Sequence, residues 1–378
     1  MVTPPAPRDH PPPHAMWREI REQPSAIAAT LRLYVEDGTL RPEFLRKVAA
    51  WLASSRDIVI AASGSSRHAA LHGKALIESL ARITTHVVYA SEYGMADVCV
   101  PEAPAVLVVS QSGETADTLA ALRGAIAAGH RTLAITNVPN SSMACTATVA
   151  LQTVAGPEQA VPATKSFATQ LLLMHLIALA AATLRGVVPE EGIAAGVRSL
   201  ALIPQLLEMQ LQQDWSVLTT SAERCLSAAP LVFLGRGLQY ALAREGALKI
   251  KETAYIPAEA MPAGELKHGP IAMLGNEASL VVLATRDPAD PGSVQRYRKT
   301  LQLLEELKTR DIDVLTIASQ DDARISSLSS RSVATPPVSE AVAPFMALVP
   351  LQLLAYEAAV KRGVDVDRPR HLVKSLQE

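Results

Sequence analysis

The chain has 378 residues, of which 49% are hydrophobic and 19% are charged, and its formal net charge is −2. This length is enough for two domains of ordinary size. A charge so close to zero gives no electrostatic reason to expect nucleic acid or an anionic membrane as a partner, so any anion must be bound locally.

Residues 1–15 form a Pro-rich, polar segment, which we expect to be a disordered tail rather than a signal peptide, because it has no apolar core. The most apolar stretch, 171–184, is too short for a membrane span and is predicted to be a buried helix. Three cysteines, Cys99, Cys145 and Cys225, occur without a CxxC pair, which is typical of a reducing compartment. These features predict a cytoplasmic protein that has no membrane as a partner.

Strands and helices alternate along the chain after a first pair of helices. Short apolar runs predict strands at Asp57–Ala62, His86–Ala90, Ala105–Val109, Arg131–Thr136 and Ala147–Thr153. After a helical segment the order restarts, with strands predicted at Leu231–Leu234, Ser279–Ala284, Asp313–Ile317 and Arg331–Thr335. We therefore predict an α/β protein with two tandem, doubly wound parallel sheets that are related by internal duplication.

The predicted domain limits follow from this pattern. N-terminal helices and the first α/β domain take residues 16–195, and a helical linker takes 196–228. The second α/β domain takes 229–363, and a C-terminal tail takes 364–378.

Residues 110–118, SQSGETADT, follow directly on a predicted parallel strand and open a helix. Free backbone N–H groups and the helix dipole favour an anion at such a place. Ser110, Ser112, Thr115 and Thr118 add hydroxyls, and a second hydroxyl-rich turn occupies 63–66. The alternative is that these residues only cap helices, but one hydroxyl is enough for a cap. We predict that the two turns hold one phosphate.

Neither turn is a nucleotide-binding fingerprint. GxxxxGK[ST] is absent, and Gly235-Arg236-Gly237 lacks the third glycine of the dinucleotide pattern. A small phosphorylated metabolite is therefore favoured over NAD or ATP, and no organic cofactor is expected. His68 and His72 stand at i and i+4, but they hold a metal only if a third ligand joins them, so no metal site is predicted.

A second group of polar residues lies within 231–270. A strand ending in a glycine turn is followed by a predicted helix, Gln239–Ala254, on which Glu245, Lys249 and Glu252 share one face. A loop then carries His268. A carboxylate, an amine and an imidazole are the groups of a proton-transfer site, yet ion pairs on a solvated helix give the same pattern. The pattern alone supports the proton-transfer site and the surface ion pairs equally.

Several long motifs resemble the sugar isomerase (SIS) domain family, and in particular the isomerase portion of glucosamine-6-phosphate synthase. The first half carries SGSS at 63–66, SQSGETADTLAALR at 110–123 and AGPEQAVPATKSFATQ at 155–170. The second half carries FLGRGLQYALAREGALKIKE at 233–252, AEAMPAGELKHGP at 258–270 and VDVDRPRHLVKS at 364–375. The resemblance implies two flavodoxin-like SIS subdomains, a phosphorylated sugar as substrate, and a homodimer with active sites at the subunit interface.

The resemblance also implies roles for individual residues. Glu252 is expected to move a proton between C1 and C2 of the sugar, with Lys249 one turn before it. His268, from the neighbouring subunit, is expected to open the sugar ring, and Lys374 in the tail that closes the site to contact the sugar carbonyl. The residues implied to bind the phosphate are Ser65, Ser66, Ser110, Gln111, Ser112 and Thr115, and those implied to line the sugar pocket are Val161, Ala163 and Thr164.

The synthase family begins with a glutaminase domain that has an N-terminal cysteine. Here residue 2 is Val and the first predicted sugar-domain strand begins near Asp57, so we expect a chain that does not take ammonia from glutamine by itself. The first hypothesis is an amino-sugar-6-phosphate deaminase/isomerase acting on glucosamine 6-phosphate. The alternatives are a glucosamine-6-phosphate synthase that depends on ammonia or a partner, and a non-catalytic sugar-phosphate sensor.

Overall fold

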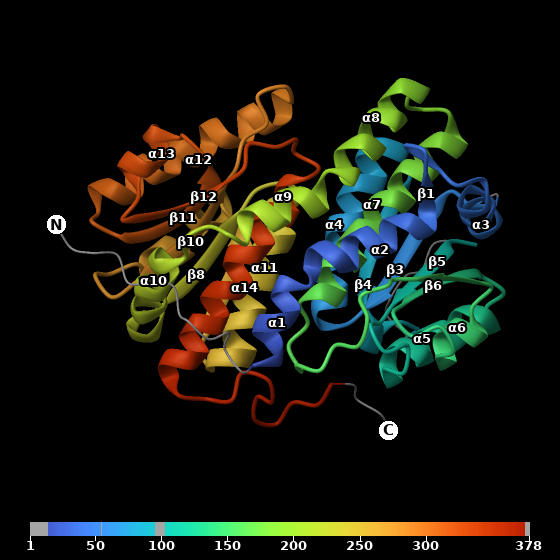
Figure 1. The fold of residues 1–378 in the computed structure, drawn as a ribbon, viewed down its shortest axis with the longest axis horizontal. Helices are drawn as coiled ribbons and strands as arrows, with labels where there is room; N and C mark the ends of the chain where they lie inside the picture. Colours follow the sequence, from blue (N-terminus) through green and yellow to red (C-terminus); the bar gives the residue numbers. More distant parts are fainter. Residues whose placement is uncertain (1–13, 54, 95–102, 375–378) are drawn as a thin grey trace.

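The computed structural model describes residues 14–53, 55–94 and 103–374, so the tail predicted at 1–15 lies almost wholly outside the described residues. Two α/β halves lie side by side, each built on a five-stranded sheet in which every pair of neighbours is parallel (Figure 1). The first sheet has the order β4 (Thr84–Tyr89), β3 (Asp57–Ala62), β5 (Ala105–Val109), β6 (Arg131–Thr136) and β7 (Val149–Gln152). The second has the order β9 (Ala258–Pro262), β8 (Leu231–Gly235), β10 (Ser279–Ala284), β11 (Asp313–Ser319) and β12 (Arg331–Thr335).

The two sheets have the same strand order, since each strand of the second takes the place of the strand five earlier in the chain. This confirms the predicted pair of duplicated parallel sheets. Strands such as β10 are apolar at nearly every position because helices cover both faces of a parallel sheet. The helices of the first half are α1 (Ala15–Arg21), α2 (Gln23–Tyr34), α3 (Pro42–Leu52), α4 (Gly64–Leu76), α5 (Ala116–Ala127), α6 (Ser142–Thr146) and α7 (Lys165–Arg185).

The connecting region holds the helices α8 (Glu190–Ala201), α9 (Ile203–Gln210) and α10 (Ser216–Ser227). The helices of the second half are α11 (Leu238–Ala254), α12 (Pro291–Thr309), α13 (Ala323–Leu328) and α14 (Ala343–Arg362). Shorter elements are the hairpin β1 (Val35–Glu36) and β2 (Thr39–Leu40), the π-helical turn η1 (Ile77–Ala81), and the 3₁₀ turns η2 (Ala90–Glu92), η3 (Glu265–His268) and η4 (Pro270–Met273).

One continuous apolar core joins the two halves. Helices α4 and α11 pack against each other, and both contribute small buried residues such as Ala69 and Ala247 to this core. Helix α7 packs on α4, and α14 packs on α11, from either side. Smaller apolar clusters fill the outer face of each sheet. The central helices are therefore held rigidly where the halves meet.

Two helices, α7 and α14, are long and apolar enough to cross a membrane by length and composition. In each, 89% of the most apolar window is buried inside the protein. Their apolar composition is explained by packing in the central core, as was predicted for residues 171–184.

Two local predictions were wrong. Residues 258–262 were expected in a loop, but they form the edge strand β9, where the terminal Pro262 is tolerated because an edge strand pairs on one side only. Residues 63–66 were expected to form a turn, but α4 begins at Gly64. Ser65 and Ser66 therefore stand in the first helical turn rather than in a loop before it.

Candidate active site

A pocket of about 220 Å³ opens where the two halves meet, at the carboxyl ends of β3 and β5. Its walls come from four separate parts of the chain and from the C-terminal tail. The lining residues are Ser63, Gly64, Ser65, Ser66, Val109, Ser110, Gln111, Ser112, Thr115, Thr118, Glu158, Val161, Ala163, Leu248, Lys249, Glu252 and Lys374. Most of the residues singled out in the sequence are thus brought together.

The β5–α5 loop presents its hydroxyls to this pocket. Ser110 Oγ lies 2.9 Å from Thr115 Oγ1 and 3.4 Å from Ser112 Oγ. Gly113 has φ +70°, and a Cβ there would come within 2.2 Å of Ser141 Oγ, so glycine is required for the loop to fold back against Ser141. The loop is held in one conformation, with three hydroxyls gathered at one point.

Helix capping does not explain these hydroxyls. Ser63 and Thr115 are the N-cap residues of α4 and α5, and neither side chain makes a capping hydrogen bond within the described structure. Thr118 Oγ1 is buried and, among the described residues, has no hydrogen-bond partner. Ser110 Oγ and Ser112 Oγ accept the backbone N–H groups of Gly113 and Glu114, so their O–H groups can still donate to an acceptor-rich ligand such as a phosphate.

Helix α11 supplies the acid–base groups. The Lys249 ammonium lies between two carboxylates, 3.2 Å from Glu245 Oε1 and in direct contact with Glu252 Oε1. Ser65 Oγ donates to Glu245 Oε1 at 2.8 Å, and His68 Nδ1 lies 2.7 Å from Glu245 Oε2. The predicted shared face of α11 is therefore real, but it packs on α4 and is not a solvated ion-pair face.

The environment of this trio sets the charge of each member. Burial by itself raises the pKa of Glu245, but the Lys249 ammonium and the hydrogen bonds with His68 and Ser65 outweigh it and lower the pKa to about 2. Burial likewise opposes charge on Lys249, and the two carboxylates outweigh it and raise its pKa. Burial raises the pKa of Glu252 above its ordinary value, and Lys249 offsets this only in part. Glu252 therefore takes up a proton at a higher pH than an ordinary glutamate.

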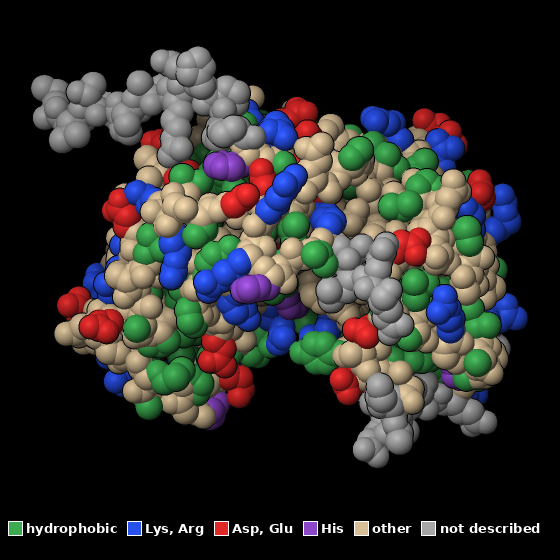
Figure 2. All heavy atoms as spheres, turned by 90° about the horizontal axis from the view of Figure 1, so that it is seen from below, with side chains coloured by type: hydrophobic (Ala, Val, Ile, Leu, Met, Phe, Trp, Pro, Cys, Tyr) green, Lys and Arg blue, Asp and Glu red, His purple; other side chains and the backbone are tan. Residues whose placement is uncertain are grey.

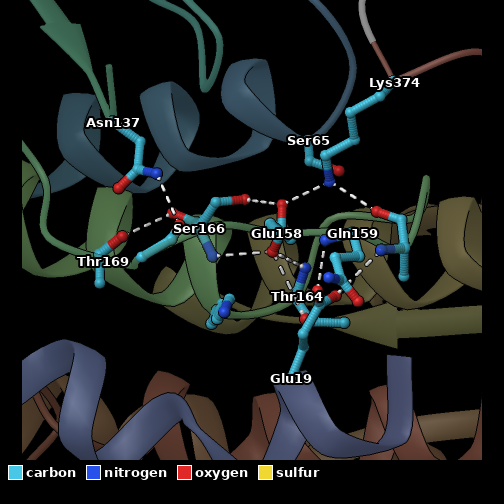
Figure 3. Close-up of polar contacts among 12 residues, drawn as sticks. Glu19, Ser65, Asn137, Glu158, Gln159, Thr164, Ser166, Thr169 and Lys374 are labelled. Atoms are coloured by element: carbon cyan, nitrogen blue, oxygen red, sulfur yellow. Dashed lines mark hydrogen bonds and ion pairs between the residues drawn. The ribbon is translucent and has the colours of Figure 1, made fainter. Parts of the chain in front are cut away.

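A further buried carboxylate, Glu158, lies on the pocket wall, and Figure 3 shows its polar partners. It accepts the backbone N–H groups of Thr164 and Ser166 at 2.9 and 3.0 Å and the Ser166 hydroxyl at 2.6 Å. Lys374 reaches it from the C-terminal tail at 2.6 Å and also donates to the carbonyl of Ala160 at 2.6 Å. Burial raises the pKa of Glu158, but Lys374 and these hydrogen bonds outweigh it and lower the pKa.

The N-terminal helix braces the same loop. Glu19 on α1 accepts the backbone N–H groups of Gln159 and Ala160. The tail residue Asp367 accepts the N–H groups of Ala15 and Met16 at the start of α1. Burial raises the pKa of Glu19 to about 7, so this carboxyl is on the edge of ionisation at neutral pH. Both chain ends therefore hold the loop that carries Glu158.

Two residues implied by the resemblance do not line the pocket within the described part of the chain. Thr164 is fully buried, and both its N–H and its hydroxyl donate to Glu158. His268 lies exposed in η3.

Several residues on the pocket wall were not in the predicted site: Ser63, Gly64, Val109, Thr118, Glu158 and Leu248. Thr118 is one of the hydroxyls of residues 110–118. Glu245 does not line the pocket but forms an ion pair with Lys249. For Glu158 the detectable signal is its place inside the 155–170 motif.

The two helical histidines do not face a common ligand. His68 binds Glu245, whereas His72 is buried and packs edge-on against His175, with ring centroids 6.3 Å apart. Burial lowers the pKa of His72 to about 3 and that of His175 to about 4, so both are neutral. Over the residues that the structure describes, no group of three His, Cys, Asp or Glu side chains is arranged to hold a metal.

Fold and site define a double α/β protein with one hydroxyl-lined pocket that carries paired acid–base groups. The chain matches the SIS domain family over residues 51–180 and 226–362, and it belongs to that family. It is 43% identical over 363 residues to a glutamine–fructose-6-phosphate aminotransferase (isomerizing) of Gloeobacter violaceus, an alignment that covers 96% of this chain and 58% of that protein. The chain thus spans little more than half the length of this relative.

Solved structures give the same result. The C-terminal domain of a glucosamine-fructose-6-phosphate aminotransferase from Francisella tularensis is 33% identical, with a TM-score of 0.86 over 96% of this chain and all of that chain. A glucosamine-6-phosphate deaminase from Thermotoga maritima is 23% identical, with a TM-score of 0.73 over 96% of this chain and all of that chain, and shares the fold.

Proposed function

We propose that this protein is a phosphosugar isomerase that converts glucosamine 6-phosphate and water into fructose 6-phosphate and ammonia. The observation that carries the proposal is the juxtaposition in one pocket of the hydroxyl-rich β5–α5 loop and the Lys249–Glu252 pair. The first can hold a phosphate and the second can transfer a proton on the sugar that the phosphate anchors.

The phosphate is assigned to the carboxyl ends of β3 and β5. Ser110, Ser112 and Thr115 supply neutral donors there, and α4 and α5 begin at the same place. Ser65, Ser66 and Gln111 complete the proposed set. A helix N-terminus favours an anion without requiring a basic side chain, which agrees with a net charge near zero.

Glu252 is the proposed acid–base residue. In the open-chain aldehyde it takes the proton from C2, giving an enolamine, and returns it to C1, giving an imine at C2. Water then adds to the imine and ammonia leaves, so that the products are fructose 6-phosphate and ammonia. Lys249, held as an ammonium by Glu245, keeps Glu252 in position and stabilises negative charge that develops nearby.

Ring opening requires a further proton carrier. We assign it to His268, acting in the pocket of a second copy of the chain, because this residue is exposed and does not line its own described pocket. Lys374 is assigned to the open-chain carbonyl, and the Glu158 carboxylate positions it. A homodimer is part of the proposal.

A second candidate is synthesis in the opposite direction, from fructose 6-phosphate and ammonia. The 43% identity to a glutamine-dependent aminotransferase favours it. The same residues serve both directions, since the proton transfer is reversible. Deamination needs only water as second reactant, and for this reason we place it first.

One assay separates these functions. Purified protein with glucosamine 6-phosphate is expected to release equal amounts of ammonia and fructose 6-phosphate. Synthesis from fructose 6-phosphate and ammonium that greatly exceeds deamination at matched substrate concentrations would favour the second candidate. Binding of the sugar phosphate without turnover in either direction would contradict both and indicate a sensor.

The shared active site has its own test. Inactive variants His268→Asn and Glu252→Gln are mixed and allowed to exchange subunits. If each pocket takes His268 from its partner, random exchange restores about a quarter of the wild-type activity, because half of the dimers then hold one intact site. No recovery despite demonstrated exchange would mean that His268 does not act in the partner's pocket, and full activity of His268→Asn alone would place this residue outside the reaction.

A further inference from the structure

A second cavity, of about 320 Å³, lies beside the candidate active site. It opens between the edge strands β4 and β9 of the two sheets, and helices α4 and α11 form its floor. It shares Gly64 and Leu248 with the candidate active site, and the ring of His68 stands in its wall. Figure 2 shows basic side chains gathered in a hollow between the two halves.

The cavity is lined by three basic side chains, Arg67, Arg244 and Lys251. The single carboxylate among the lining residues is Glu259, which is exposed. Over the described part of the chain, none of the three cations forms an ion pair with a carboxylate. Three positive charges therefore face one cavity in a protein whose net charge is −2.

The two arginines are held by aromatic rings instead of by acids. The Arg67 guanidinium stacks 3.7 Å from the centroid of the Tyr89 ring. Arg244 Nη1 donates to the Tyr240 hydroxyl at 3.0 Å. Stacking and a neutral hydroxyl orient a guanidinium but leave its charge uncompensated.

Part of the hydrogen-bonding capacity of these arginines is unused. Arg67 Nε and Nη1 and Arg244 Nε are buried atoms that have no hydrogen-bond partner within the described structure. A buried N–H without an acceptor is costly, so such donors are usually matched by a ligand, a water or an ion. Burial lowers the pKa of Arg67, and the nearby Arg244 lowers it further, which is the effect expected of crowded positive charge.

We propose that this cavity is a second ligand site, which binds a small oxyanion separately from the phosphate of the sugar substrate. Arg67 and Arg244 provide the planar N–H donors that match two oxygens of one phosphate or carboxylate, and Lys251 adds a further charge. This site goes beyond the proposed function, because it uses none of the residues assigned to turnover.

The test is a titration of the full-length protein with inorganic phosphate by isothermal calorimetry at low ionic strength. The wild-type protein is expected to bind phosphate in both pockets. Arg67→Leu/Arg244→Leu is expected to lose one class of site, with its affinity reduced at least tenfold, and Ser110→Ala/Ser112→Ala to lose the other. Arg324→Leu, which removes an exposed arginine paired with Glu305, is the matched control and keeps both classes.

The outcomes are distinguishable. Both phosphate classes surviving in the folded Arg67→Leu/Arg244→Leu protein would overturn the second site. If that variant misfolds, Lys251→Gln, whose side chain is exposed, serves in its place and must weaken one class only. A shift of the arginine variant from dimer to monomer, with phosphate binding unchanged, would overturn the proposal too and mark the cavity as a contact between subunits. If the wild-type protein binds phosphate only in the class that Arg67→Leu/Arg244→Leu removes, the phosphate assignment of the proposed function is contradicted and the second site is supported.

Discussion

At the carboxyl end of β5 stands Ser110, and at the equivalent end of β10 in the second half stands Thr285. The Ser110 hydroxyl faces the pocket beside two other hydroxyls. The Thr285 hydroxyl instead accepts a hydrogen bond at 2.8 Å from Gln239 of α11. The two halves share a topology, yet the hydroxyl at this position lines the pocket in one half and bonds to a neighbouring helix in the other.

The helices that follow β3 and β8 also contribute differently to the pocket. Helix α4 of the first half gives the pocket mainly its first turn, at 64–66. Helix α11 of the second half gives the pocket residues from its last turns, Lys249 and Glu252. The two halves are thus similar frames, and the proposed function assigns the phosphate to the first and the acid–base groups to the second. Variants in either half test this division.

The largest effect is expected from Glu252→Gln. Without a carboxylate that exchanges the proton, kcat should fall roughly 10²- to 10⁴-fold, while binding of the sugar phosphate is retained. Steady-state kinetics and calorimetry measure the two quantities. Glu305→Gln, on the outer helix α12 of the same half, is the control and should leave both unchanged. Retained turnover in Glu252→Gln would exclude Glu252 as the acid–base residue.

The same residue predicts a pH dependence. Glu252 must be ionised to accept the C2 proton, and burial raises its pKa above the ordinary 4.5. Activity should therefore be present at high pH and be lost, as the pH falls, at a pH above that of an ordinary glutamate. A kcat profile that stays flat down to pH 4.5 would contradict the raised pKa.

Gly113→Ala should disrupt the packing of the β5–α5 loop, to which the proposed function assigns the phosphate. The added Cβ meets Ser141 Oγ at 2.2 Å in a backbone with φ +70°. Clash and strain together should lower the free energy of unfolding by about 3 kcal/mol. Gly129→Ala has a similar φ of +78° and nothing within 4 Å of its Cβ, so strain alone should cost about 1 kcal/mol. Urea unfolding measures the difference, and equal losses would exclude the clash.

Ser112→Ala and Thr285→Ala compare the two halves directly. Loss of one hydrogen bond to a phosphate should raise KM for glucosamine 6-phosphate about tenfold in Ser112→Ala, with kcat little changed. Thr285→Ala should leave KM at the wild-type value, because this hydroxyl is occupied by Gln239. An equal rise in both variants would mean that the second half also binds the phosphate.

The smallest effect concerns the brace between α1 and the loop that carries Glu158. The pKa of Glu19 is raised in the folded state to about 7, so the folded protein binds this proton more tightly than the unfolded chain does. The stability gained from binding this proton is complete below pH 4.5 and is lost as the pH rises through 7. Glu19→Gln should therefore be more stable than wild type by about 2 kcal/mol at pH 8 and similar to it near pH 5. Equal differences at both pH values would contradict the raised pKa.

Much of the fold could be predicted from the sequence. The short, continuous apolar runs at 57–62, 105–109 and 279–284 are typical of strands that are buried on both faces of a parallel sheet. Strand β9 was missed because an edge strand is only half buried and its flanking prolines are also typical of loops. The early start of α4 was missed because Gly64-Ser65-Ser66 favours turns when no tertiary contact is known.

The site was partly readable in the same way. Hydroxyls crowded at a strand end indicate an anion site because parallel strands all end at one edge. The sequence did not decide between a catalytic and an ion-pair role for Glu245, Lys249 and Glu252, because their spacing is the same in both. The packing of α11 on α4 decided it in favour of a buried trio, with Ser65 and His68 as further partners.

The sequence by itself determined two parallel α/β sheets, a phosphate-type loop at 110–118 and a helix with three charged residues on one face. Only the tertiary structure decided that the loop, the helix and the C-terminal Lys374 share one pocket, and that Glu158 belongs to it. The reason is physical. Local patterns record the environment of each residue along its own element, whereas a pocket depends on contacts between residues more than a hundred positions apart, which only the packed core brings together.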